Sequence, residues 1–176
     1  LCMVYRELWP FSFRDAQDQS VIATAVQISA AADPLGATSG ICRSIQHLVN
    51  VRRLEAKSSV DSFLLPYPQI AVLYEMKADL LIHEKDFLAA LGYAKKCQEL
   101  WPQWLKAFYL EAYVHYLKEA YAEAHRVASN LASKYPFHNK SQVLRAALEY
   151  YEKKDSAGAE KLLKKHMATV DELSDE

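Results

Sequence analysis

Glycine and proline are scarce in this sequence, with 4 glycines and 6 prolines among 176 residues. These two residue types supply most tight turns and β-bulges, and no segment alternates valine or isoleucine with polar residues as a strand would. The chain is 51% hydrophobic, which is enough to bury a sizeable core. The sequence therefore favours an all-α fold and argues against a sandwich or a barrel.

Cysteine and net charge are also low. The three cysteines are widely spaced and form no CxxC pair, so we expect neither a disulfide framework nor a metal site, and a reducing, cytoplasmic location fits best. A formal net charge of −1 supplies no broad basic field, which makes nucleic acid an unlikely partner. The apolar opening "LCMVYRELWPFSF" is interrupted by Arg6, Glu7 and Pro10, so we expect no membrane span there.

Catalytic signatures are missing as well. None of the six histidines belongs to an HExxH pattern, and the tetrapeptide "HEKD" at 83–86 falls at an expected turn between helices. No GxSxG motif, glycine-rich phosphate loop or Cys/His dyad spacing is present. We therefore expect no enzyme activity and no cofactor in this chain.

Helical spacing of apolar residues begins near the N-terminus. The pattern predicts one helix from Ser12 to Asp33, ended by "DPLG". A second helical segment is expected to begin with Thr38 or Ser39 as its cap, to be divided at Asn50, and to stop at the "PYP" of 66–68.

From residue 69 onward the chain repeats itself with a period of 34 residues, which is the distance between Pro102 and Pro136. A period of this length is typical of helix–turn–helix units that stack on one another. The same shift aligns five further pairs without a gap: Tyr74 with Phe108, Ala78 with Ala112, Phe87 with Tyr121, Ala90 with Ala124, and Ala94 with Ala128.

These positions resemble the tetratricopeptide repeat (TPR) family, whose pattern has an aromatic residue at repeat position 4, small residues at positions 8, 20 and often 27, and proline at position 32. Small residues are needed where the two helices of a repeat approach each other closely. When Pro102 is set at position 32, Ala71 becomes the first residue of a repeat, and the pattern is filled by Tyr74, Ala78, Ala90 and Cys97.

The resemblance departs from the family pattern at position 7, which is usually leucine and here holds Lys77 and Glu111. We interpret this as divergence within the fold. In the third repeat the turn "KKDS" is one residue longer, so that Ala159 takes position 20.

The resemblance implies a right-handed α-solenoid of TPR-like antiparallel helix pairs with an N-terminal capping helix. The predicted segments are an N-terminal helical cap at 1–36, a degenerate helical repeat at 37–70, TPR repeats at 71–104 and 105–138, a divergent TPR-like repeat at 139–167, and an acidic tail at 168–176.

In the family, the first helix of each repeat lines the concave surface, and the resemblance places a set of expected peptide-binding residues there. Tyrosine suits such a groove because its ring offers flat apolar contact with little rotamer entropy to lose. A peptide with a basic residue at one end and an acidic group or C-terminal carboxylate at the other would complement the charges. The expected site residues are Glu75, Asp79, Lys106, Tyr109, Tyr113, Tyr116, Lys140, Tyr150 and Tyr151, whereas Phe108 and Tyr121 fall at packing positions.

Two interpretations of this surface remain open, namely an open groove or one covered by the capping helix or a neighbouring chain. The TPR subclass that holds chaperone C-termini needs lysines and asparagines at fixed groove positions, five in all. In one register only Lys140 matches, with Glu75 and Asp79 where donors are required, and in the register one repeat earlier only Lys106 matches. We therefore predict no carboxylate-clamp binding of chaperone C-termini.

The leading hypothesis is a non-catalytic protein-interaction scaffold that binds a partner segment in a tyrosine-lined concave groove. The alternatives are a substrate-recognition TPR domain of a larger enzyme, an RNA-binding helical repeat similar to the pentatricopeptide arrays, and a small secretion chaperone built from three such repeats.

Overall fold

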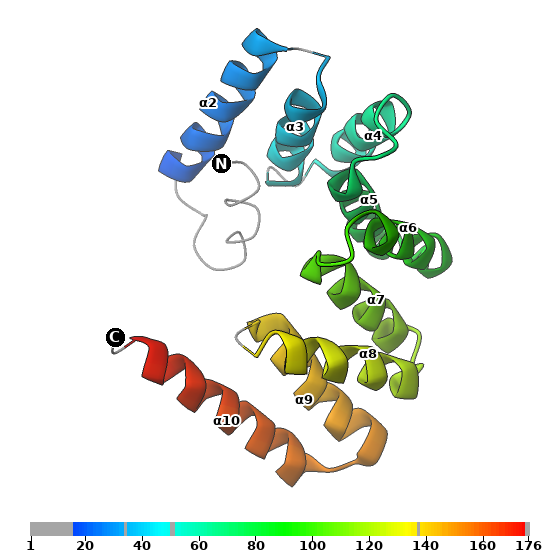
Figure 1. Ribbon diagram of the computed structural model, residues 1–176, viewed down its shortest axis with the longest axis vertical. Coiled ribbons are helices and arrows are strands. Elements are labelled where there is room, and N and C mark those ends of the chain that lie inside the picture. The colour runs from blue at the N-terminus through cyan, green and yellow to red at the C-terminus, as the bar shows by residue number, and fades with distance from the viewer. Residues whose placement is uncertain (1–15, 34, 50–51, 137, 175–176) are drawn as a thin grey trace. The chain divides into compact units, whose positions relative to one another are not determined.

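The computed structural model describes residues 16–33, 35–49, 52–136 and 138–174, and within those ranges it holds helices and turns but no strand (Figure 1). The expected all-α class is confirmed. None of the helices in the described ranges is long and apolar enough to cross a membrane. The helices are α2 (Ala16–Ala32), α3 (Ala37–Val49), α4 (Arg53–Leu64), α5 (Ala71–His83), α6 (Phe87–Leu100), α7 (Leu105–Leu117), α8 (Tyr121–Lys134), α9 (Asn139–Lys153) and α10 (Ser156–Ser174).

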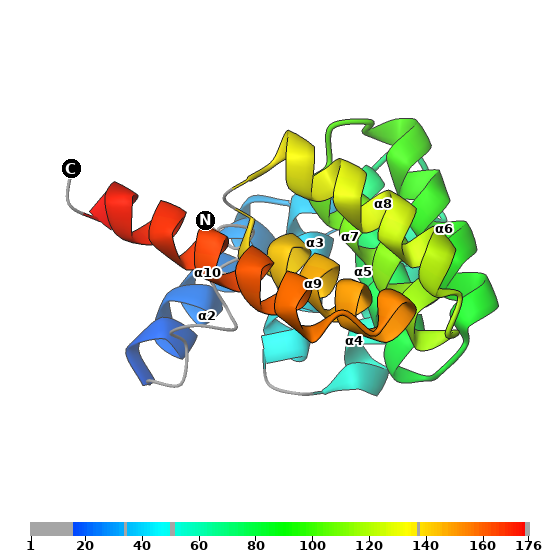
Figure 2. The ribbon, with the colours of Figure 1, turned by 90° about the horizontal axis from the view of Figure 1, so that it is seen from below.

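The chain forms two compact units, residues 1–80 and 81–176, and the division falls inside α5. In the first unit, α2 packs on α3 and α3 packs on α4. In the second unit, each helix from α6 to α10 packs on the next one along the chain. Figures 1 and 2 show α9 beside both α8 and α10, and α9 also touches α7 directly. The first helices of the second and third repeats, α7 and α9, are therefore neighbours.

The helix boundaries follow the repeat frame closely. The residues expected to begin three repeats, Ala71, Leu105 and Asn139, are the first residues of α5, α7 and α9. The division at Asn50 also agrees with the separate helices α3 and α4, although residues 50–51 lie outside the described ranges.

Two expected boundaries differ from the structure. Helix α3 begins at Ala37, so Thr38 and Ser39 lie inside its first turn instead of capping it, and the buried Ser39 hydroxyl has no hydrogen-bond partner among the described residues. The expectation of a cap at these residues was wrong, because a cap residue precedes the first helical turn. At the C-terminal end, α10 continues to Ser174, so the acidic tail expected at 168–176 is helical from residue 168 to Ser174.

The contact between paired helices is made by alanine. Alanines at repeat position 8 and their counterparts at position 20 are almost completely buried, with exposed fractions of 0–1%. Because a methyl group separates the backbones, α7 and α8 can pack closely along much of their length. The alanines concerned are Ala78, Ala112 and Ala146 at position 8 and Ala90 and Ala124 at position 20.

The turn inside each repeat uses one residue in the left-handed backbone region. Lys85 and Glu119 have φ angles of 62° and 60° and occupy equivalent positions, whereas in the third repeat the left-handed residue is Lys154, one position later. The later position agrees with the longer turn expected there. Two of the following helices are capped by an aspartate, since Asp86 accepts from the Ala89 N–H at 3.1 Å and Asp155 accepts from the Gly158 N–H at 2.9 Å.

The charged residues at repeat position 7 are buried and have partners on the helix that precedes them. The ammonium of Lys77 donates to both carboxylate oxygens of Asp61 on α4, at 2.5 and 2.6 Å. Glu111 accepts from Gln98 on α6 at 2.8 Å. A buried charge is tolerated only when it is paired, so these contacts explain how the fold accommodates the departure from leucine.

Gly40 marks a place where α3 and α4 touch without room for a side chain. A methyl group at this position would lie 2.3–2.5 Å from ring carbons of Phe63, which is buried on α4. Gly40→Ala is therefore expected to lower the free energy of unfolding by about 1–3 kcal/mol, measured by urea denaturation.

Gly92 provides the matched control, because it lies within α6 and a methyl group there would meet nothing within 4 Å. Gly92→Ala is expected to raise the free energy of unfolding by about 1 kcal/mol, since alanine is the better helix former. Equal stability of the two variants would contradict the close contact between α3 and α4.

Candidate functional site

Three tyrosines on α7 form a row of stacked rings. Tyr109, Tyr113 and Tyr116 follow one another at spacings of four and three residues, which places them on one face of the helix. The ring centroids of Tyr109 and Tyr113 are 5.8 Å apart with an interplanar angle of 8°, and those of Tyr113 and Tyr116 are 6.2 Å apart at 18°. Both distances lie in the range of favourable aromatic pairs.

The row continues onto α9. The ring of Tyr151 lies 5.7 Å from that of Tyr116 and 5.3 Å from that of Tyr150, edge to face in both cases. Tyr121, the first residue of α8, stacks on Tyr151 at 5.9 Å and also contacts Tyr116. We call Tyr109, Tyr113, Tyr116, Tyr121, Tyr150 and Tyr151 the tyrosine cluster.

A hydrogen bond between phenols joins the two halves of the cluster. Burial raises the pKa of the Tyr116 phenol above its usual value of 10, and the hydrogen bond with Tyr151 raises it further. The neighbouring phenols of Tyr121 and Tyr113 act in the same direction. At neutral pH the Tyr116 phenol is therefore protonated and able to donate.

The underside of the cluster belongs to the core. The rings of Tyr109, Tyr113, Tyr116 and Tyr121 pack on a buried group that includes Ala112, Ala124 and Leu148. Exposure is concentrated at the α9 end, where Tyr150 and Tyr151 have exposed fractions of 47% and 39%. The cluster thus has a fixed, half-buried part on α7 and an accessible part on α9.

The opposite end of the cluster is cationic. His138, directly before α9, contacts the ring of Tyr109 edge to face at 5.9 Å, and its Nδ1 lies 2.5 Å from the Ser141 hydroxyl. Burial, and after it the positive charges of Lys140 and Lys106, lower the pKa of His138 to about 4. The structure therefore brings both lysines of the expected site near this neutral histidine.

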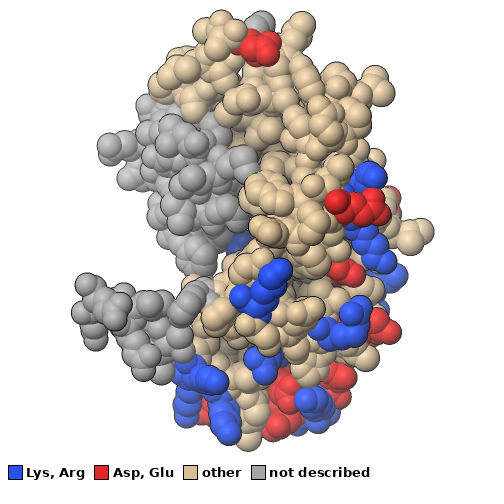
Figure 3. All heavy atoms as spheres, in the orientation of Figure 1, with Lys and Arg blue, Asp and Glu red and all other residues tan. Residues whose placement is uncertain are grey.

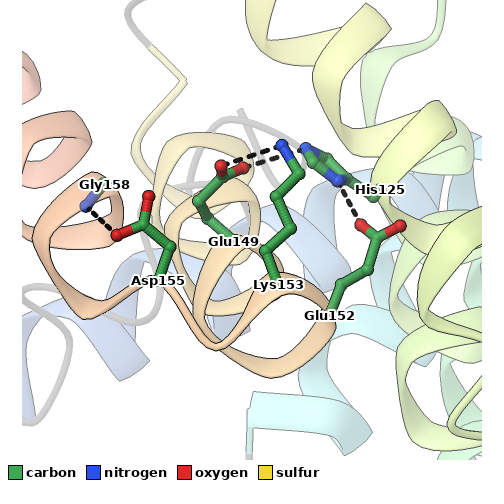
Figure 4. A network of polar contacts seen from close by, with 6 residues as sticks. All are labelled: His125, Glu149, Glu152, Lys153, Asp155 and Gly158. Atoms are coloured by element: carbon green, nitrogen blue, oxygen red, sulfur yellow. Dashed lines mark hydrogen bonds and ion pairs between the residues drawn. The ribbon is translucent and has the colours of Figure 1, made fainter.

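Polar contacts between α8 and α9 fix the segment that carries Tyr150 and Tyr151 (Figure 4). His125 on α8 points between Glu149 and Glu152, with its Nε2 at 3.4 Å from a Glu149 oxygen and its Nδ1 bonded to Glu152. Lys153 donates to the other Glu149 oxygen at 2.8 Å. Because Glu149 and Glu152 flank the two exposed tyrosines in sequence, this network holds their stretch of α9 against α8.

The two acidic residues of the expected site are placed differently from the tyrosines. Glu75 and Asp79 lie on α5 in the first unit, and Asp79 is half-buried. Glu75 is completely buried, so its carboxylate does not face solvent, and contact with a peptide would require its cover to be displaced. The peptide-binding role of these two residues stays a prediction.

The structure adds two residues that sequence reasoning did not assign to the site. Tyr121 was expected to be a packing residue, and it does pack on the core, but it also joins the rings of α7 and α9. His138 was considered only as a candidate metal ligand or base. The sequence did offer one signal for His138: it directly precedes the first residue of a repeat, which places it beside the first turn of α9.

No cluster of three or more His, Cys, Asp or Glu side chains is placed to hold a metal ion within the described ranges. The chemistry that the site does offer is aromatic contact, hydrogen bonding by phenols and positive charge at one end.

Solved structures with the same fold include tetratricopeptide repeat proteins. MamA has a TM-score of 0.72 and 15% identity, with 94% of this chain and 100% of MamA covered. A tetratricopeptide repeat protein from Parabacteroides merdae ATCC 43184 has a TM-score of 0.72 and 17% identity, with 95% of this chain and 64% of that chain covered. YrrB, a TPR protein with an unusual peptide-binding site, has a TM-score of 0.64 and 15% identity, with 96% and 93% covered.

No protein-family model matches the chain, and no curated protein matches it. The likeness to solved structures therefore establishes the fold, and the expected TPR-like fold is confirmed.

Acidification is expected to destabilise the chain through His138. Its pKa is about 4 in the folded chain and has an ordinary value of 6.5, so the unfolded chain takes up the proton first as the pH falls. The stability contributed by neutral His138 is present above pH 6.5 and is lost between 6.5 and about 4. Urea denaturation across this range should show a shallower decline for His138→Gln than for the wild type.

His83→Gln is the control, because His83 is exposed at the end of α5. It should follow the wild-type decline. If the stability of His138→Gln also declines as that of the wild type does, the burial of neutral His138 is not the cause of the loss of stability in acid.

Proposed function

We propose that this chain is a protein-interaction scaffold that binds an extended or helical segment of a partner protein against the tyrosine cluster, without a covalent step. The observation that carries the proposal is the unbroken series of ring contacts from Tyr109 on α7 to Tyr150 on α9. Rings that already pack on one another and on the core have little conformational freedom to lose when a ligand arrives.

The exposed tyrosines are the expected centre of binding energy. Tyr150 and Tyr151 keep the largest exposed fractions in the cluster, so they have the most apolar area to bury under a ligand. Tyr113 packs on the buried core, so its truncation would also loosen the fold, whereas Tyr151 is not among the rings that pack on that core. Tyr151 is therefore a cleaner probe of binding than Tyr113.

Charge favours a particular orientation of the ligand. Lys106 and Lys140 lie near His138 at the Tyr109 end, where an acidic side chain or a C-terminal carboxylate of the partner would be attracted. A basic residue at the other end of the ligand, opposite Glu75 and Asp79, remains part of the sequence-based prediction.

The comparison with YrrB supports this proposal, because that TPR protein is described as having a peptide-binding site and shares the fold of this chain. A recognition domain of a larger enzyme would use the same surface in the same way. RNA binding is the less favoured alternative, since a net charge of −1 supplies little attraction for phosphates.

Tyr151→Ala is expected to weaken binding of peptides selected on the wild-type chain by phage display. Loss of one central ring should cost about 1–3 kcal/mol, which is a roughly 5- to 150-fold rise in Kd by isothermal titration calorimetry. Tyr151→Phe separates the contribution of the ring from that of the phenol hydrogen bond with Tyr116.

Leu88→Ala is the matched control, because Leu88 is 77% exposed on α6 and lies outside the cluster. Its variant should bind the selected peptides as the wild type does. Wild-type affinity of the selected peptides for Tyr151→Ala would contradict the proposed site, and so would a loss of affinity for Leu88→Ala.

A further inference from the structure

A second candidate site lies where α8, α9 and α10 meet, and it shares no lining residue with the tyrosine cluster. It is an open pocket of about 380 Å³, within the size range of small-molecule sites. Its wall combines cationic and polar side chains with an apolar side. The lining residues that matter here are Arg145, Lys165, His166, Ser133, Ala132 and Leu162.

Arg145 is the unusual member of this wall. Its Nε is buried, and no hydrogen-bond partner for it lies within the part of the chain that the structure describes. A buried polar atom without a partner costs free energy, and a guanidinium more than most. The cost would be removed by a ligand with acceptor oxygens.

The repeat frame explains why Arg145 differs from its equivalents. It occupies repeat position 7, where Lys77 binds Asp61 and Glu111 binds Gln98 on the preceding helix. The residue one period after Gln98 is Ala132, which lines the pocket beside Arg145 and has no polar side chain to offer. The third repeat has thus kept a charged residue at this position, half-buried and with a buried Nε, without that partner.

A pocket in the equivalent place one repeat earlier supports this comparison. It has a volume of about 230 Å³ and is lined by Glu111, Val127 and Leu131 among others. There the charged residue at position 7 is satisfied by Gln98. The two pockets differ in the sign of the residue at position 7, which is Glu111 in one and Arg145 in the other. They also differ in its hydrogen bonding, since Glu111 accepts from Gln98 and the Arg145 Nε has no partner among the described residues.

His166 restricts the class of ligand that fits the pocket. His166 Nε2 lies 2.7 Å from the amide oxygen of Asn139, and in the tautomer that carries its proton on Nε2 the ring leaves Nδ1 as an acceptor. That Nδ1 is buried and has no partner among the described residues. A matching ligand therefore brings acceptor oxygens for Arg145 and a hydroxyl donor for His166, and it reaches these two buried atoms only when the side chains turn toward the pocket.

We propose that this pocket binds a phosphate monoester. The group has several acceptor oxygens for the planar guanidinium of Arg145 and, in its monoanionic form, an acidic hydroxyl that can donate to His166 Nδ1. Because its second pKa is about 6, a phosphate monoester keeps this proton far more readily than a carboxylate or a sulfate does, so binding can hold the monoanion in the pocket near neutral pH. Lys165 adds positive charge and Ser133 a hydroxyl, while Leu162 and Ala132 give an apolar wall for the rest of the ligand.

On the face drawn in Figure 3, Lys and Arg side chains lie over the described part of α10, with Asp and Glu side chains beside them.

The test uses the full chain and measures binding by calorimetry at constant ionic strength, together with the imidazole nitrogen signals of His166 by NMR. The probes are inorganic phosphate, sulfate and acetate. The expected result is saturable phosphate binding with a Kd in the millimolar range or below, tighter than sulfate or acetate, with a shift of the His166 Nδ1 signal. Glycerol 3-phosphate and a capped phosphoserine peptide then compare a small metabolite with a phosphorylated side chain as the source of the group.

Arg145→Gln should weaken phosphate binding by about tenfold or more, the worth of a hydrogen bond between charged groups. Circular dichroism establishes that the variant is folded, and Lys165→Gln provides a second variant with a weaker loss. Lys164→Gln is the matched control, because Lys164 is exposed and its Nζ lies 2.6 Å from Glu160.

Three results would overturn the proposal: no saturable phosphate binding, equal binding by folded Arg145→Gln and wild type, or acetate binding as tightly as phosphate.

Discussion

The close approach of paired helices at alanine is the constraint on which the other features depend. Ala78, Ala90, Ala112, Ala124 and Ala146, at repeat positions 8 and 20, have almost no exposed area, and a larger side chain there would push the two helices apart. Because Ala112 and Ala124 let α7 and α8 pack closely, the tyrosines of α7 come to rest on a continuous core. The ring contacts that cross to α9 follow from that packing.

The tyrosine cluster has two physical roles that cannot be separated residue by residue. Its α7 members cover the core and hold one another in place, whereas its α9 members keep a large part of their rings exposed. The α7 rings therefore pack on the core, and the α9 rings are the part of the cluster that a ligand can contact. A rigid, half-buried row supports an accessible end, which is the arrangement that a binding surface with low entropic cost requires.

Charged residues inside the repeats show how a family pattern can be altered without loss of the fold. Position 7 holds a charged residue in each of three repeats, buried in two of them, where the preceding helix supplies the partner, and half-buried in the third. In the third the partner position is alanine, and a pocket opens beside Arg145. A buried Nε kept without its partner is more easily explained by a ligand than by stability.

Periodicity was enough to predict much of the fold. A repeat of 34 residues located the first residues of α5, α7 and α9, because burial of one helical face recurs with the repeat. The resemblance to the TPR family, applied to that frame, selected five tyrosines that the structure brings into contact. Periodicity did not predict the cap of α3, since Thr38 and Ser39 are good capping residues but the helix begins one residue earlier.

The remaining features depend on contacts between segments that periodicity does not describe. The role of Tyr121 arises from its place at the start of α8 beside Tyr151, and the partners of Lys77 and Glu111 come from the preceding helix. The burial of Glu75 likewise depends on what covers it. Repeat position alone assigns a residue to a face, and only the packed neighbours decide whether that face is open.

The most direct test of the central claim is a map of amide chemical shifts in the isotope-labelled chain as a selected peptide is added. The account predicts that the largest changes fall on α7 and α9 around the tyrosine cluster, with smaller changes near His138. Changes confined to α6, or to the first unit alone, would contradict it.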